Sequence, residues 1–195
     1  MKLILGSGSP RRKEILESVF GNIDILPPHI DESILPGEKP ADYTMRIVNA
    51  KMDSVLNNGS GDSIYNTSDT IVTIDNRILG KPESRDDAYS MLRLLSGREH
   101  SVITGLCISQ VQNGYPWRKS AYEVSSVIFR KLEDDGINKY LDLINYSDKA
   151  GSYAVQEYGE MIVDSINGSV TNVIGLPLSL LFRMMGDAGL MMSLL

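Results

Sequence analysis

Residues 1–15, MKLILGSGSPRRKEI, determine how the rest of the chain is interpreted. Lys2–Leu5 has the apolar run of a short buried strand. Ser9 is suited to the N-cap of a following helix, and Pro10 to its first position. That helix would carry the consecutive cations Arg11–Lys13 in its first turn, where the helix dipole already places about half a positive charge. A bound anion would explain cations at this unfavourable place.

The glycine-serine loop before this helix predicts a phosphate site. The alternative is that the cations extend into solvent, which costs little free energy at an exposed position. A P-loop is excluded, because it requires a second glycine followed by Lys and Ser/Thr. A dinucleotide fingerprint is excluded as well, because Arg11 stands where its third Gly or Ala is required. The loop therefore belongs to neither of these common phosphate motifs.

The composition limits the class of protein. With 195 residues, 42% of them hydrophobic and 23% charged, the chain can bury the core of one domain or of two lobes around one cleft. No stretch approaches the ~20 apolar residues of a membrane span, and Leu3–Leu5 is too short for a signal peptide. The single cysteine, Cys107, excludes an internal disulfide and lies in an apolar run. The net charge of −6 disfavours a nucleic-acid polymer as partner. We therefore expect a cytoplasmic protein with a small anionic ligand and no membrane partner.

Strand and helix patterns mix without the regular alternation of a doubly wound fold, which predicts an α/β fold with a mixed central sheet flanked by helices. Strands are predicted at residues 2–5, 23–26, 67–74, 101–109, 122–129, 153–156 and 161–166. Helices are predicted at residues 10–20, 40–56, 85–96, 133–145 and from 177 onward. Residues 57–63 are predicted to form a flexible internal loop and Asn113-Gly114 a hairpin turn. The apolar tail 190–195 either packs back or mediates self-association.

The second helix carries one candidate functional residue. The residues predicted on one of its faces are Tyr43, Ile47, Ala50 and Ser54. Lys51 lies near the edge of that face, so it either leans toward a cleft or lies along the surface with its charge in solvent.

Polar residues interrupt the predicted elements at several points. Asp31-Glu32 lies between a strand and a Pro-Gly turn, and Asp69-Thr70 lies at the mouth of a β-branched strand. Lys81 lies in a rigid Gly-Lys-Pro tripeptide, and residues 148–151 precede the strand that leads to Gln156. Each has an alternative explanation as an ordinary turn residue. Their occurrence together favours a functional site.

From end to end the chain resembles the Maf family of nucleoside triphosphate pyrophosphatases. The blocks that carry the resemblance are SGSPRRKEIL, IDES, SDTIVTIDNRILGKP, LRLLSGREHSVITG, DKAGSYAVQ and NGSVTNVIGLPL. The resemblance implies a single domain over residues 1–195 with two lobes around a nucleotide cleft, as in inosine-triphosphatase-like enzymes. It also implies a homodimer, a divalent metal (Mg²⁺ or Mn²⁺), and hydrolysis between the α- and β-phosphates to a nucleoside monophosphate and pyrophosphate.

The resemblance also implies roles for individual residues. Asp69 matches the proton acceptor, and Glu32 and Lys81 complete the expected catalytic set. Glu32 and Asp69 are oxygen ligands suited to the metal. The expected substrate-binding residues are Ser9, Arg11, Arg12, Lys51, Thr70, Lys149 and Gln156. Among these, Arg11, Thr70 and Gln156 match the positions for substrate choice.

The block AGSYAVQ resembles the branch that acts on dTTP and UTP. The Gln156 amide offers both a donor and an acceptor to the N3–H and O4 edge of thymine or uracil. A 7-methyl-GTP pyrophosphatase and a nucleotide-binding regulator of cell division are the alternatives. The sequence departs from the family at Gly6 for a common Ala, at Thr67-Ser68 for Gly-Ala, and at Glu157 for Gly.

Overall fold

A computed structural model describes residues 1–59, 61–112 and 114–190. The chain forms two compact units. Unit 1 comprises Met1–Asp69, Thr104–Glu123 and Gly175–Leu195, and unit 2 comprises Thr70–Ile103 and Val124–Ile174. This division agrees with the two predicted lobes. The nucleotide cleft and the single functional domain stay predictions.

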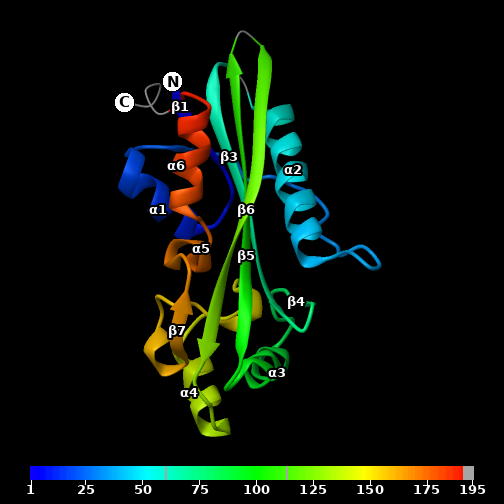
Figure 1. Cartoon of the computed structure of the whole chain (residues 1–195), viewed down its shortest axis with the longest axis vertical. Helices are drawn as coiled ribbons and strands as arrows, with labels where there is room; N and C mark the ends of the chain where they lie inside the picture. The colour runs from blue at the N-terminus through cyan, green and yellow to red at the C-terminus, as the bar shows by residue number, and fades with distance from the viewer. Residues whose placement is uncertain (60, 113, 191–195) are drawn as a thin grey trace. The chain divides into compact units, whose positions relative to one another are not determined.

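The described residues form a mixed α/β fold, which confirms the predicted fold class (Figure 1). Within these residues the strands follow the order β2 (Asp24–Ile25), β1 (Lys2–Gly6), β3 (Ser63–Ile74), β5 (Glu99–Gln112), β6 (Tyr115–Phe129) and β7 (Val163–Asn167), with β4 (Arg77–Leu79) paired to β3. β1 pairs in parallel with β2 and β3, whereas β3–β4 and β6–β7 are antiparallel. No helix of the described chain is long and apolar enough to cross a membrane.

Unit 1 contains the N-terminal strand and the helices that cover its part of the sheet. Its complete elements are β1 (Lys2–Gly6), α1 (Pro10–Phe20), β2 (Asp24–Ile25), α2 (Pro40–Asn58) and α6 (Leu178–Asp187). Its other strand segments come from β3 (Ser63–Ile74), β5 (Glu99–Gln112) and β6 (Tyr115–Phe129).

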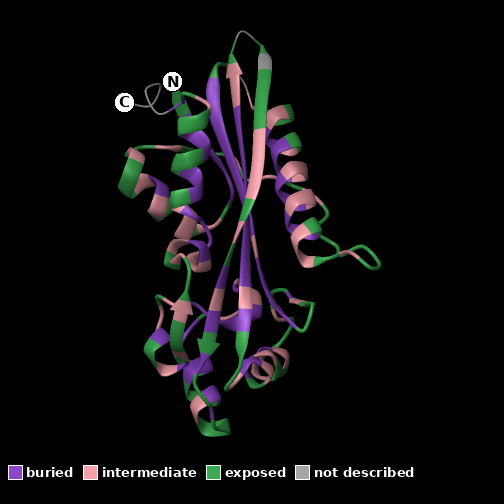
Figure 2. Ribbon diagram, viewed as in Figure 1, coloured by how far each residue is buried: buried purple, intermediate pink, exposed green. Residues whose placement is uncertain are grey.

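Two apolar clusters lie on opposite faces of the sheet in unit 1. Ile64 of β3 packs with Leu16 of α1 and with α6, while the adjacent Tyr65 packs with Val48 and the rest of the α2 cluster. This alternation follows from the two-residue period of a strand. Figure 2 shows β3 and β5 mostly buried and the helices exposed on their outer faces, whereas both residues of β2 are exposed. Cys107 is buried in the α2 cluster, and the apolar residues of α6 are core.

Unit 2 contains the remaining parts of β3, β5 and β6. Its own elements are β4 (Arg77–Leu79), α3 (Arg85–Leu95), α4 (Asp134–Leu143), the 3₁₀ turns η1 (Ala150–Ser152) and η2 (Gly159–Met161), β7 (Val163–Asn167) and α5 (Val170–Ile174). The hairpin between β3 and β4 turns at Asp75 and Asn76, which both have positive φ, as this turn requires. Ser84 caps α3 by accepting a hydrogen bond from Asp87 N.

Several predictions of local structure are wrong. Residues 153–156 form no strand, because Gly151 and Ser152 have φ of 67° and 64° and turn the chain just before them. The next strand begins at Val163, not at Met161, because 3₁₀ turn η2 ends there. Sequence analysis missed α5. Residue 60 of the predicted loop, Asn113 of the predicted turn, and residues 191–195 of the apolar tail lie outside the described residues.

Candidate active site

A buried lysine joins two of the predicted acidic residues in unit 1. Lys51 Nζ lies 2.7 Å from Asp69 Oδ1 and 2.9 Å from Glu32 Oε1. Lys51 and Asp69 are buried, whereas the Glu32 side chain is 46% exposed. An isolated buried charge is costly, and the contact between Lys51 and Asp69 offsets part of the cost of burying both side chains. The arrangement leaves Glu32 as the member of the group that solvent reaches.

The periods of β3 and α2 explain why these side chains meet. Asp69 lies on the same face of β3 as Tyr65 and Thr67, and that face packs against α2. Lys51 lies on the buried face of α2, together with Val48 and other apolar residues. Two predictions are corrected here. Lys51 is not at the edge of the helix face, and Asp69 lies inside a strand that already begins at Ser63, not at its mouth.

The predicted face of α2 is therefore shifted. Ala50 and Ser54 are only partly buried. The residues that α2 buries are Tyr43, Thr44, Ile47, Val48, Lys51, Met52 and Val55.

Arg12 is held at the end of β1 by two acceptors. Its Nε donates to Gly175 O at 2.9 Å, and its Nη1 donates to Ser7 Oγ at 3.1 Å. Burial lowers the pKa of the Arg12 guanidinium, while the charges of Asp69 and Glu32 act to raise it. Arg12 is therefore within electrostatic reach of the Lys51 group. Sequence analysis missed Ser7, which carries no signal apart from its place in the loop.

The other predicted residues of the first loop occupy the expected positions. Ser9 is the N-cap of α1 and Pro10 its first residue, but the Ser9 side chain makes no capping bond within the described chain. Its backbone N–H donates to Ser7 Oγ at 3.2 Å. Arg11 is partly buried, and its charge lowers the pKa of Arg12, which places the two cations near each other.

Unit 2 brings the Lys81 and Lys149 segments together. Gly151 N donates to Gly80 O at 3.0 Å, next to Lys81. Gly151 has a φ of 67°, and a Cβ atom there would lie 2.9 Å from a side-chain carbon of Val72. Glycine is therefore required at this junction, both for the backbone conformation and for the close approach.

Lys149 and Gln156 lie in different environments. Lys149 is buried, and its Nζ lies 3.0 Å from Asp148 Oδ1 and 3.3 Å from Glu157 Oε1. Gln156 is exposed in the turn beside Glu157. Lys81 is also exposed, and among the described residues its side chain forms no hydrogen bond or ion pair. Thr70, the first residue of unit 2, is partly buried.

Glu32 and Asp69 are the two carboxylates expected to bind a metal ion. No group of three or more His, Cys, Asp or Glu side chains with metal-binding geometry occurs among residues 1–59, 61–112 and 114–190. Glu32 and Asp69 are nevertheless brought together at Lys51 Nζ. Mg²⁺ binds proteins through one or two carboxylates and takes its other ligands from water and phosphate. This donor set fits such an ion.

Comparison with known proteins gives the family. A sequence profile described as Maf-like protein matches residues 2–188. The chain belongs to the Maf family. It is 44% identical over 179 residues to the dTTP/UTP pyrophosphatase of Clostridioides difficile, covering 92% of this chain and 91% of that protein. It is 39% identical over 187 residues to the dTTP/UTP pyrophosphatase of Caldanaerobacter subterraneus, covering 95% and 88%.

A solved structure, that of the Staphylococcus aureus Ham1 protein, matches 96% of this chain and 100% of that one at 11% identity. Its TM-score of 0.47 is too low to bear on the fold or the activity.

Proposed function

We propose that this member of the Maf family hydrolyses nucleoside triphosphates between the α- and β-phosphates and prefers dTTP and UTP. The observation that carries the proposal is the contact of Lys51 with both Asp69 and Glu32, with Arg12 within electrostatic reach. The support for the substrate is the 44% identity to a dTTP/UTP pyrophosphatase over 179 residues.

The reaction requires a water molecule to attack the α-phosphorus. Asp69 takes the proton of that water, the bond from the α-phosphorus to the bridging oxygen breaks, and pyrophosphate leaves. Arg12 and Lys51 stabilise the negative charge that develops on the leaving group, together with Ser9 and the amides of the first loop. A divalent ion held by Glu32 and Asp69 would supply further positive charge against the phosphates.

The remaining proposed contacts are Thr70, Lys81, Lys149 and Gln156 of unit 2 and Arg11 of unit 1. Lys81 and Lys149 bind phosphate, and Thr70, Gln156 and Arg11 select the substrate. The exposed Gln156 amide supports this role, because it presents a donor and an acceptor that match the edge of uracil or thymine.

The test is pyrophosphate release from dTTP, UTP, CTP, 7-methyl-GTP and ATP with Mg²⁺, Mn²⁺ or Co²⁺. We expect dTTP and UTP to be hydrolysed fastest and Asp69→Asn to lose most turnover while keeping its fold. A preference for 7-methyl-GTP would overturn the assignment of the base. Nucleotide binding without release from any substrate would favour a regulator in place of an enzyme.

We also propose a cytoplasmic location and a homodimer. The single buried thiol of Cys107 supports a reducing compartment. The support for the dimer is the family resemblance alone, and a monomer in light scattering at high concentration would remove it.

A further inference from the structure

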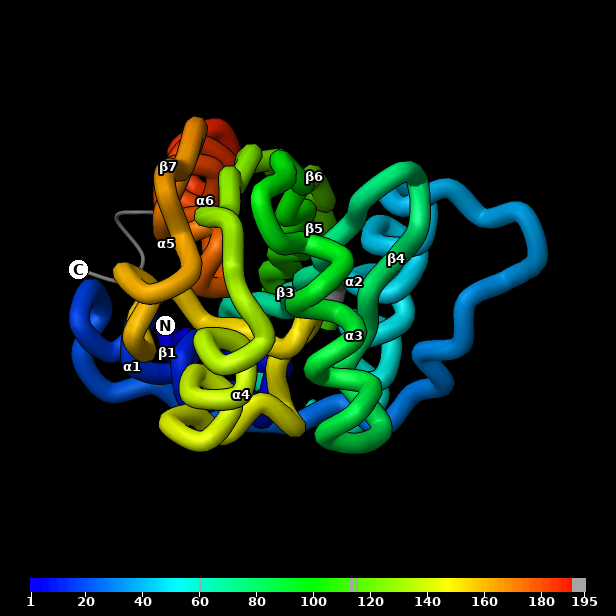
Figure 3. The backbone as a smooth tube through the Cα atoms, turned by 90° about the horizontal axis from the view of Figure 1, so that it is seen from below, coloured from blue at the N-terminus to red at the C-terminus, as the bar shows by residue number. Residues whose placement is uncertain are grey.

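The candidate residue Glu32 lies in a segment that has no regular structure. Residues 26–39, between β2 and α2, contain neither helix nor strand. Figure 3 shows this stretch projecting away from α2. Leu26 packs against the α2 cluster at the start of the segment, but Ile34 and Leu35, close to Glu32, are both 51% exposed. Polar contacts must therefore hold Glu32 where its carboxylate reaches Lys51.

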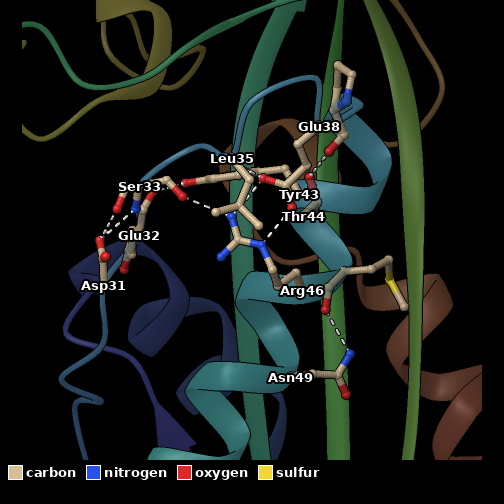
Figure 4. Close-up of polar contacts among 11 residues, drawn as sticks. Asp31, Glu32, Ser33, Leu35, Glu38, Tyr43, Thr44, Arg46 and Asn49 are labelled. Carbon is tan, nitrogen blue, oxygen red and sulfur yellow. Dashed lines mark hydrogen bonds and ion pairs between the residues drawn. The ribbon is translucent and has the colours of Figure 1, made fainter.

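Arg46 of α2 makes the largest set of these contacts (Figure 4). Its Nε lies 2.6 Å from Glu38 Oε1, and its Nη2 lies 2.7 Å from Glu38 Oε2. Nη2 also donates to Ser33 O at 2.9 Å. A bidentate contact between a guanidinium and a carboxylate fixes the direction of the interaction as well as its distance. Arg46 thereby joins both Ser33 and Glu38 of this segment to α2.

Glu38 in turn holds the backbone of Leu35, which lies between Ser33 and Glu38. Its Oε2 accepts a hydrogen bond from Leu35 N at 3.1 Å, and its own N–H donates to Leu35 O at 3.1 Å. The hydrogen bond with Arg46 lowers the pKa of Glu38, and Glu38 raises the pKa of Arg46. Both groups therefore stay charged at neutral pH.

Tyr43 holds the backbone of Glu32 itself. Its hydroxyl donates to Glu32 O at 2.9 Å, and the guanidinium carbon of Arg46 lies 5.4 Å from its ring centre. Burial and the charges of Asp69 and Glu32 raise the pKa of Tyr43, so its hydroxyl keeps its proton and remains a donor. Arg46 thus packs on the ring of Tyr43 and itself contacts Ser33 and Glu38.

We propose that Arg46 is a positioning residue, which fixes the loop of residues 31–38 on α2 so that the Glu32 carboxylate lies against Lys51. The consequence for catalysis rests on the proposed function. Without Arg46 the loop keeps the Tyr43 bond but loses its anchors at Ser33 and Glu38. The Glu32 carboxylate then leaves its place beside Lys51 and Asp69 for much of the time. Base recognition, assigned to Gln156, is unaffected.

The kinetic test is a double-mutant cycle of Arg46→Ala and Glu32→Gln with dTTP as substrate. We expect Arg46→Ala alone to lower kcat/KM about 10-fold or more, since small displacements of a catalytic group are costly. The preference for dTTP over CTP should not change. In the Glu32→Gln background the same substitution should cost less than about 2-fold, because Arg46 acts through Glu32. An equal loss in both backgrounds would overturn the proposal.

Two further variants separate positioning from general damage. Arg46→Lys keeps the charge but not the bidentate geometry, so its kcat/KM should lie between those of the wild type and of Arg46→Ala. Arg98→Ala is the matched control, because Arg98 also contacts both carboxylate oxygens of one residue, Asp75, at 2.8 Å and 2.7 Å in unit 2. It should leave kcat/KM unchanged. A loss there equal to that of Arg46→Ala would contradict the proposal.

Hydrogen–deuterium exchange of the residue 30–39 backbone tests the loop without any substrate. Arg46→Ala should speed exchange there while the strands of unit 1 stay protected, and Arg98→Ala should not. Unchanged exchange in Arg46→Ala would overturn the proposal. If the wild-type protein released no pyrophosphate, the proposed function would fail, but the exchange result would still decide whether Arg46 holds the loop.

Discussion

Single side chains in this protein owe their ionisation to what surrounds them, and His100 shows this most clearly. His100 is buried between the rings of Phe129 and Tyr153, and its Nε2 lies 2.8 Å from Tyr153 Oη. Burial lowers the pKa of His100 from 6.5 to about 4. His100 is therefore neutral in the folded protein at the pH at which nucleotides are hydrolysed in cells, and it has a structural role.

This shift predicts a loss of stability in mild acid. Below about pH 6.5 the unfolded chain binds a proton at His100 while the folded protein does not, so the free energy of unfolding falls as the pH drops toward about 4. The full effect is about 3 kcal/mol, at 1.36 kcal/mol per pH unit. His100→Gln should flatten the pH dependence of urea unfolding in this window. An unchanged slope would contradict the prediction.

Sequence reasoning selected three residues that the structure brings into contact, but it did not predict their surroundings. Asp69, Glu32 and Lys51 were named before the structure showed their contacts. The burial of Lys51 was missed, because a lysine on a helix is usually solvated. Arg46 and Tyr43 were missed as well, since contacts between a helix and an irregular loop leave no periodic pattern in the sequence.

At the scale of elements, the first and third strands fit each other through one unusual pair. Gly6 of β1 lies opposite Thr67 of β3. A Cβ atom on Gly6 would lie 2.6 Å from Thr67 Cγ2 and 2.7 Å from Val55 Cγ2. Thr67 in turn donates from Oγ1 to Val48 O at 2.8 Å, which ties β3 to α2 next to Asp69. These two departures from the family are thus complementary in volume.

This pairing predicts a non-additive effect on stability. Gly6→Ala should destabilise the protein by about 1–3 kcal/mol, as over-packing does. Thr67→Ser removes Cγ2 but keeps the hydroxyl, so Gly6→Ala should cost less in that background. Urea unfolding of the single and double variants measures both costs. Equal costs would show that Thr67 does not determine the need for glycine.

The elements themselves were predictable where periodicity and capping agree. The helices predicted at residues 85–96 and from 177 onward correspond to α3 and α6. The strand predicted at residues 153–156 is absent, because the apolar residues there pack in a turn. A short apolar run without alternation does not distinguish a strand from another buried segment. Gly151 and Ser152 turn the chain just before these residues, and their positive φ angles depend on tertiary contacts.

At the scale of the whole molecule, the mixture of strand and helix patterns predicted the fold class. No local signal in the sequence marks the division into two units. The long strands β3, β5 and β6 contribute residues to both units, so no linker or change of composition marks a boundary. The net charge of −6 opposes a polyanionic ligand at long range. The proposed binding of a nucleoside triphosphate therefore calls for local cations such as Arg12, and a divalent ion would add to them.

Thermal unfolding of the whole chain tests that dependence. A ligand that binds only the folded protein stabilises it by about 2.7 kcal/mol at 100 times its Kd. For 195 residues this corresponds to a rise in Tm of roughly 5–10 °C. We expect this rise with a non-hydrolysable dTTP analogue and Mg²⁺, and a smaller one with the analogue and EDTA, because Glu32 and Asp69 would then face the phosphates without a divalent ion to offset their charge. The matching ATP analogue is the control for the base and should shift Tm less. An equal shift with EDTA would contradict metal-assisted binding, and an equal shift with the ATP analogue would contradict base selection by Gln156.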